Sequence, residues 1–190
     1  YGNIKTASCC FPTGVESSDT EPTFKQDILI YEGRYYQIGI GHKEYPAEKI
    51  MDQDYYVLTL AAIARELARE DIAEASVYIA AGLPLSWVGK QKQAFKEYLL
   101  QNREVAFTYR NKEYHLHIVG AEVFPQGLAA IAPNLQDFSG SYMLCDIGNG
   151  TMNVLYMVNG RPQSGKMYTE KFGTYQCTLA IREMFMQKTQ

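Results

Sequence analysis

The sequence predicts a mixed α/β protein in which helices cover β-sheet. Three observations lead to this prediction. Hairpin signals dominate the first 50 residues, helix-like and strand-like periodicities alternate over 54–131, and a three-stranded meander precedes a final helix. Of the 190 residues, 46% are hydrophobic and 21% are charged, which is typical of a globular chain and excludes disorder, coiled coil and collagen-like structure.

The first part of the chain is predicted to hold strands, turns and one helix. A β-prone stretch, a polar loop and two further strands are expected at 3–11, 14–22, 27–31 and 34–40. Glu32-Gly33, between the last two strands, is a hairpin signal. A helix is expected over about 54–70, because apolar residues recur on one helical face at Val57, Leu60, Ala61, Ala64, Leu67 and Ala68.

The middle of the chain is predicted to alternate between strands and helices. The expected elements are a strand at 75–81, a helix that follows the candidate N-cap Ser86, strands at 104–110 and 113–120 joined at Asn111-Lys112, and a short helix at 124–131. Phe95, Tyr98 and Leu99 lie at helical spacing in the first of these two helices, so we expect them to face the core.

The last 50 residues are predicted to form a meander and a helix. Strands are expected at 142–147 and 151–158, and the strong turn signal Asn159-Gly160 predicts a third strand after Arg161. Gly173 is expected to open the final helix, which carries apolar residues on one side: Cys177, Ala180, Ile181 and Phe185.

Charge and cysteine content exclude several functions. Eighteen Lys and Arg against 21 Asp and Glu give a net charge of −3, and without a basic run we expect no direct binding of nucleic acid. The apolar runs are too short for a membrane helix. Cys9, Cys10, Cys145 and Cys177 are not spaced with the histidines as zinc ligands, so reduced thiols in a cytoplasmic protein are expected. His115 and His117 share one strand face and are predicted to lie on its solvent side.

The run from Cys145 to Val154 carries the clearest chemical signal. An apolar strand delivers Asp146, glycines turn the chain, and a second strand leaves. Glycines let backbone N–H groups approach an anion closely, whereas the carboxylate suits a divalent cation that bridges to phosphates. We therefore predict a phosphate-binding hairpin with a carboxylate on its metal side. It is neither a P-loop nor a Rossmann turn, since no Gly-Lys-Ser/Thr and no helix directly follow the glycines.

The segment Gly2-Asn3-Ile4-Lys5 repeats part of this pattern, because small polar residues follow a glycine as they do after Gly150. Two such hairpins in one chain predict two related halves that face each other across a nucleotide. Lys5 would add a positive charge beside the phosphates. The hypothesis requires glycine-bent turns around Gly2 and Gly150 to enclose one polyphosphate.

These motifs resemble the actin-like ATPases of the plasmid-segregation type, the ParM and StbA relatives. The resemblance covers nearly the whole chain and rests on four segments in family order: residues 1–5, residues 82–99, residues 123–127 and residues 146–151. It implies an actin-like (ribonuclease H-like) ATPase fold with an N-terminal domain over 1–140 and the start of a second domain over 141–190. It also leads us to expect a chain trimmed at both ends.

The resemblance implies a role for each candidate residue. Gly2, Asn3 and Lys5 match positions that contact phosphate, Asp146 matches the aspartate on the magnesium side, and Gln126 matches the residue that orients the attacking water. The second phosphate cradle corresponds to Gly148, Asn149, Gly150 and Thr151. The implied ligands are ATP or GTP with Mg²⁺. The implied partners are further copies of the protein in a filament and a DNA-binding adaptor of a plasmid partition system, without direct DNA or membrane binding.

Each residue taken alone also has an ordinary structural reading, and two other functions remain open. Asp146 is compatible with a simple strand-to-turn exit, Gln126 with a helix start, and Lys5 with a solvated strand position. One alternative is a small-molecule kinase of the same superfamily, in which Asp54 or Asp137 would act as the base. The other is an interaction domain that hydrolyses nothing, because the resemblance places the Asp-x-Gly of the family's first phosphate loop just before Tyr1, outside this sequence. The 15 tyrosines, whose rings favour interfaces, indicate assembly only.

Overall fold

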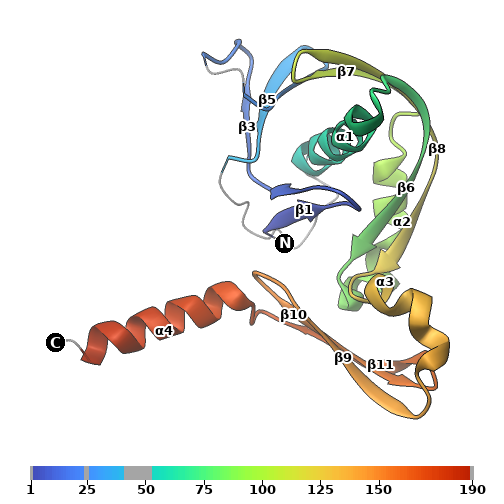
Figure 1. Cartoon of the computed structure of the whole chain (residues 1–190), viewed down its shortest axis with the longest axis vertical. Coiled ribbons are helices and arrows are strands. Elements are labelled where there is room, and N and C mark those ends of the chain that lie inside the picture. Colours follow the sequence, from blue (N-terminus) through green and yellow to red (C-terminus); the bar gives the residue numbers. More distant parts are fainter. Residues whose placement is uncertain (1, 24–25, 41–52, 189–190) are drawn as a thin grey trace. The chain divides into compact units, whose positions relative to one another are not determined.

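The computed structural model describes residues 2–23, 26–40 and 53–188 (Figure 1). Residue contacts divide the chain into two compact units, which are described separately. Unit 1 comprises Tyr1–Ile79 and Ala94–Glu122, and unit 2 comprises Ala80–Gln93 and Val123–Gln190. No helix in the described ranges is long and apolar enough to cross a membrane.

Unit 1 is built on two sheets. A two-stranded antiparallel sheet pairs β1 (Asn3–Lys5) with β2 (Cys10–Pro12). A six-stranded sheet has the order β3-β5-β4-β7-β8-β6. Its strands are β3 (Val15–Ser18), β4 (Ile28–Tyr31), β5 (Arg34–Ile38), β6 (Glu74–Leu83), β7 (Glu104–Tyr109) and β8 (Lys112–Pro125), and the last residues of β6 and β8 belong to unit 2.

The core of unit 1 forms around α1 (Gln53–Leu67), which contacts β1, β4 and β5 (Figure 1). Tyr56, Leu58 and Leu60 are fully buried, and a 3₁₀ turn, η2 (Ala68–Glu70), extends the helix as far as the sequence predicted. The next helix, α2 (Leu85–Leu99), begins in unit 2 and ends in unit 1, where it buries its predicted apolar residues Phe95, Tyr98 and Leu99. Because α2 already begins at Leu85, Ser86 lies inside the helix and is not its N-cap.

The predicted hairpins of unit 1 form where the turn chemistry placed them. Glu32 and Gly33, with φ of 50° and 76°, connect β4 to β5. The turn between β7 and β8 consists of Arg110 and Asn111, one residue earlier than predicted, because Lys112 already pairs with Tyr109. Along β8, residues 114, 116 and 118 are buried while His115 and His117 are exposed, which confirms the predicted solvent side.

Unit 2 departs from the prediction at its start. Residues 124–131 do not form one helix, because β8 continues to Pro125 and α3 (Leu128–Ile131) begins only after Gly127. Ala121 and Val123 are buried in the strand, the Gln126 N–H donates to the Leu83 carbonyl at 2.8 Å, and Gly127 has a φ of 81° that a helix cannot contain. A 3₁₀ helix, η3 (Ala132–Asp137), follows α3.

The rest of unit 2 is the predicted meander and helix. Strands β9 (Ser141–Ile147), β10 (Met152–Val158) and β11 (Arg161–Glu170) form an antiparallel sheet with β10 in the centre. Leu155 and Met157 are its buried core, against which six hydrophobic residues pack: Leu128, Ile131, Leu135, Tyr142, Leu144 and Met167. The final helix, α4 (Thr174–Lys188), has no buried residue among those that the structure describes.

Candidate functional site

Asp146 and the glycines form the predicted turn between two strands of unit 2. Asp146 lies one residue before the end of β9 and pairs with Asn153 of β10. Residues 148–151 connect these strands; we call them the second glycine turn, because the sequence predicted a first one around Gly2. The turn is closed by a hydrogen bond from the Gly148 N–H to the Thr151 carbonyl at 2.8 Å. The Asp146 side chain is half-buried, Asn149 is exposed, and Thr151 is buried. A carboxylate therefore stands directly beside a glycine-rich turn.

The start of α4 packs against the second glycine turn and orients its backbone. The N–H groups of Thr174 and Tyr175 donate to the carbonyls of Gly148 and Asn149, both at 3.0 Å. Gly173 permits this approach, because a Cβ at that position would overlap the backbone of Asn149. The first N–H groups of α4 thus donate to the turn. The helix that holds the turn in place is distant from it in sequence and does not directly follow the glycines.

Backbone carbonyls of the second glycine turn are hydrogen-bonded, whereas three of its backbone N–H groups have no acceptor among the described residues. While two of its carbonyls accept from α4, the N–H groups of Asn149, Gly150 and Thr151 donate no hydrogen bond to any residue that the structure describes. Consecutive backbone N–H groups in a turn form a concave site for an anion. A Cβ placed on Gly150 would meet nothing within 4 Å, so there is open space on that side of the turn. The turn therefore has the features of a phosphate-binding site.

Gln126 is held next to the strand that carries Asp146. Its side-chain Nε2 donates to the Gly82 carbonyl at 3.3 Å, and a Cβ on Gly82 would lie 3.0 Å from the Gln126 Cγ. A Cβ on the following residue, Gly127, would lie 3.0 Å from the Asp146 Cβ and 3.4 Å from its Oδ2. The structure therefore brings the segments around residues 82, 126 and 146 together within one unit.

The first hairpin, β1 with β2, differs in detail from the predicted turn around Gly2. Its tight turn consists of Thr6 to Cys9 and contains no glycine; it is closed by the Thr6 N–H on the Cys9 carbonyl at 2.9 Å. Asn3 and Lys5 are exposed on β1, and the buried Gly2 accepts a hydrogen bond from the Thr13 N–H at 3.2 Å. Tyr1 lies outside the described residues, so a turn that includes it stays a prediction.

The two segments that were predicted to contact phosphate belong to different units. Gly2 is in unit 1 and Gly150 is in unit 2, so a nucleotide shared between them stays a prediction. Within the described ranges, no group of three or more His, Cys, Asp and Glu residues could hold a metal ion. Mg²⁺ is usually bound through one or two carboxylates with phosphate oxygens and water, so the single carboxylate of Asp146 beside a phosphate turn fits this ion.

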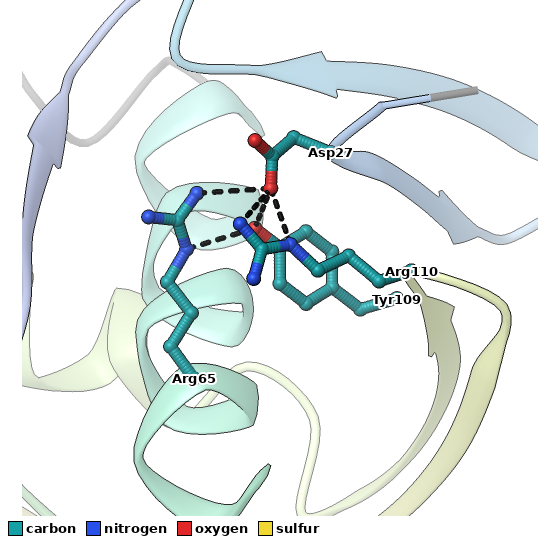
Figure 2. Close-up of polar contacts among 4 residues, drawn as sticks. All are labelled: Asp27, Arg65, Tyr109 and Arg110. Atoms are coloured by element: carbon teal, nitrogen blue, oxygen red, sulfur yellow. Dashed lines mark hydrogen bonds and ion pairs between the residues drawn. The ribbon is translucent and has the colours of Figure 1, made fainter. Parts of the chain in front are cut away.

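A network around Asp27 was missed by sequence reasoning (Figure 2). The Asp27 Oδ1 accepts from Tyr109 Oη at 2.9 Å, Arg65 Nη2 at 3.2 Å and Arg110 Nε at 2.5 Å. Burial tends to raise the pKa of Asp27, but the hydrogen bonds from Arg110 and Tyr109 and the charges of Arg110 and Arg65 outweigh it, so this pKa lies below 3.8. Burial raises the pKa of Tyr109 to about 12. These residues are scattered in sequence, and no motif marks them.

The sheets, the flanking helices and the glycine turn with its carboxylate define an actin-like fold. Solved structures share it. The archaeal actin homologue Ta0583 has a TM-score of 0.74 at 19% identity over 95% of this chain and 61% of its own. AlfA from a B. subtilis plasmid, solved as a filament, has a TM-score of 0.66 at 20% identity over 98% of this chain and 76% of its own.

ParM from Bacillus thuringiensis, solved with ATP, has a TM-score of 0.66 at 16% identity and covers 97% of this chain and 60% of its own. A profile described as "Actin like proteins N terminal domain" matches residues 1–128, and the chain therefore belongs to this family of actin-like proteins. Comparison with curated proteins gave no significant match. The chain spans about 61% of Ta0583 and 64% of a second matched ParM protein.

Proposed function

We propose that this chain is the nucleotide-binding part of a cytoplasmic actin-like ATPase that assembles into filaments and acts in plasmid DNA segregation. ATP hydrolysis would control the stability of the polymer, and a DNA-binding adaptor would connect the polymer to its plasmid. The family supports the nucleotide-binding class, and the filament and ATP-bound structures of similar fold support assembly and the choice of ligand. The domain boundary at residue 140 belongs to the same proposal.

The observation that carries the proposal is the arrangement in unit 2, where Gln126-Gly127 lies against Asp146 at the second glycine turn. The N–H groups of residues 149–151, which have no hydrogen-bond acceptor among the described residues, suit phosphate oxygens. The Asp146 carboxylate repels phosphate but suits the cation that accompanies it. A turn that merely ends a strand requires neither the N–H groups without acceptors nor the contact of Gly127 with Asp146. Their combination supports the proposal that the turn binds a nucleoside triphosphate.

Each candidate residue has a distinct task in this mechanism. The N–H groups of Asn149, Gly150 and Thr151 would donate to phosphate oxygens. In the first hairpin, Gly2 and Asn3 would also contact phosphate, and the exposed Lys5 would contribute a positive charge. Asp146 would hold Mg²⁺, which when bound neutralises phosphate charge. The side-chain amide of Gln126 can donate and accept hydrogen bonds but is no effective base, so it orients a water molecule, and hydrolysis is slow.

Calorimetric titration with ATP, with and without Mg²⁺, tests the proposal. We expect Mg²⁺ to tighten ATP binding to the unsubstituted protein, and Asp146→Asn to remove most of that increase. Glu183→Gln is the matched control, because Glu183 is an exposed acidic residue on α4 of the same unit. Equal dependence on Mg²⁺ in the Asp146 variant and in the control would contradict the assigned role of Asp146.

Light scattering together with phosphate release tests the link between hydrolysis and the polymer. ATP with Mg²⁺ should raise the scattering of the protein, and Gln126→Ala should slow phosphate release and prolong the scattering. Scattering that does not respond to nucleotide, combined with phosphate transfer to a small-molecule hydroxyl, would instead indicate the kinase alternative.

A further inference from the structure

The first hairpin is too small to hold its own shape. Strands β1 and β2 contain three residues each, and Asn3 pairs with Pro12, Ile4 with Phe11, and Lys5 with Cys10. An isolated two-stranded hairpin is marginally stable in water even when it is longer. Contacts from elsewhere in unit 1 must therefore fix the position of the hairpin.

Glu66 of α1 binds the turn of this hairpin with both carboxylate oxygens. Oε2 accepts from the Ser8 hydroxyl at 2.7 Å, and Oε1 accepts from the Ser8 N–H at 3.1 Å and contacts the Cys9 Sγ at 3.8 Å. Hydrogen bonding to the hydroxyls of Thr6 and Ser8 holds the pKa of Glu66 below its usual value, so it is ionised at neutral pH. The turn is thus capped by a charged acceptor from a helix.

The place of Glu66 on α1 is informative in itself. It lies in the last α-helical turn, directly before η2, where the negative end of the helix dipole disfavours an acidic side chain. Helix stability therefore does not account for a glutamate at this position. The contacts with Ser8 account for it, because the hairpin turn lies next to this end of the helix.

Arg65, the preceding residue, holds the other strand of the hairpin. Its guanidinium carbon lies 3.9 Å from the centroid of the Phe11 ring on β2, and Phe11 is buried. Arg65 is itself fixed by Asp27 and Tyr109 (Figure 2). Two consecutive residues of α1 therefore hold the first hairpin. Arg65 packs on the Phe11 ring and also donates to Tyr109 of β7, and Glu66 binds the hairpin turn.

We propose that Glu66 is a positioning residue for the first phosphate-contacting hairpin. The inference rests on the proposed nucleotide-binding function. Lys5 is the last residue of β1 and directly precedes the turn that Glu66 caps, so the cap fixes the end of the strand from which Lys5 projects. Without the cap, the turn frays, and the positive charge of Lys5 is no longer held at one place.

Glu66→Ala and Glu66→Gln test this inference, with Glu70→Gln as the control because Glu70 is an exposed acidic residue on the adjoining η2 turn. Hydrogen exchange of the Ser8 amide should become at least about tenfold faster in Glu66→Ala, because its acceptor is gone. The Kd for ATP with Mg²⁺ should rise about fivefold to tenfold in Glu66→Ala. It should rise less in Glu66→Gln, which keeps one acceptor oxygen.

A double variant separates positioning from a general loss of structure. If Glu66 acts through Lys5, Glu66→Ala should weaken ATP binding much less in a Lys5→Gln background, since the two effects are then not additive. Fully additive effects, or an unchanged Kd in Glu66→Ala, would overturn the inference while ATP binding itself persists. If the unsubstituted protein bound no ATP, the proposed function would fail, and the inference would fail with it.

Discussion

Replacement of Asp27 by Asn is expected to destabilise the protein by about 2 kcal/mol, because it removes the charge on which three donors converge. A hydrogen bond to a charged group contributes roughly 1.5–3 kcal/mol, and Asn keeps one acceptor oxygen for the closest donors. Most of the loss comes from Arg65, whose side chain is 15% exposed and would lose its counter-charge. Asp27 at 32% and Arg110 at 56% exposure are partly screened by water, so their pairing adds little.

Urea unfolding followed by circular dichroism measures this change. Asp19→Asn is the matched control, because Asp19 pairs with Arg34 where the side chains are 83% and 52% exposed, and we expect a change of at most about 0.5 kcal/mol. The reasoning would be refuted if the Asp27 and Asp19 variants had the same free energy of unfolding at neutral pH.

The pH dependence gives an independent check of the stabilisation by the Asp27 charge. The pKa of Asp27 is lower in the folded protein than its ordinary value of 3.8, so its ionised form stabilises the fold above that value. This contribution is lost as the pH falls through the lowered pKa, where the folded carboxylate takes up a proton. The stability difference between the unsubstituted protein and Asp27→Asn should therefore be full at neutral pH and shrink below pH 3.8. A difference that does not change with pH would exclude a charge effect.

Three further predictions concern packing and glycine geometry. Thermal or urea unfolding measures the changes in stability, and calorimetric titration measures ATP binding. Gly173→Ala should lower the free energy of unfolding by about 1–3 kcal/mol, because its Cβ would overlap Asn149. Gly89→Ala in α2, where a Cβ meets nothing within 4 Å, should raise it by about 0.5–1 kcal/mol. Gly127→Ala should cost about 1–3 kcal/mol through its φ of 81° and should also weaken Mg²⁺-dependent ATP binding. Leu58→Ala, which opens a cavity in the core, should lower the free energy of unfolding by about 2–5 kcal/mol. Similar stabilities for Gly173→Ala and Gly89→Ala would contradict the packing argument.

Local signals predicted the fold where local chemistry decides the structure. Glu32-Gly33 and Asn159-Gly160 adopt the positive φ angles that their hairpins require, and these angles depend on the residues themselves. Helix α1 was predicted because its periodicity extends over several turns. The helix predicted at 124–131 was wrong because pairing and burial in the sheet hold residues 121–125 in a strand, and no property of the short segment itself reveals its neighbours.

The sequence predicted the contiguous part of the candidate site, but not the contacts between segments that are distant in sequence. Asp146 and the second glycine turn are contiguous in sequence, so their geometry could be derived from the motif. The approach of Gly127 to Asp146 and of Gly173 to Asn149 depends on segments that are distant in sequence and meet only in the fold. In both cases a glycine marked the contact, since a close backbone approach excludes a side chain, but the sequence does not say what approaches.

The two segments that we propose to contact phosphate are held by different means, and this difference has a consequence for mutation. The second glycine turn is supported by backbone contacts from α4, so side-chain truncations nearby should leave it in place while an added Cβ at Gly173 distorts it. The first hairpin is supported by the side chains of Arg65 and Glu66, so truncation loosens it. A substitution scan measured by ATP affinity should therefore be most sensitive to glycine replacement in unit 2 and to loss of charged side chains on α1 in unit 1.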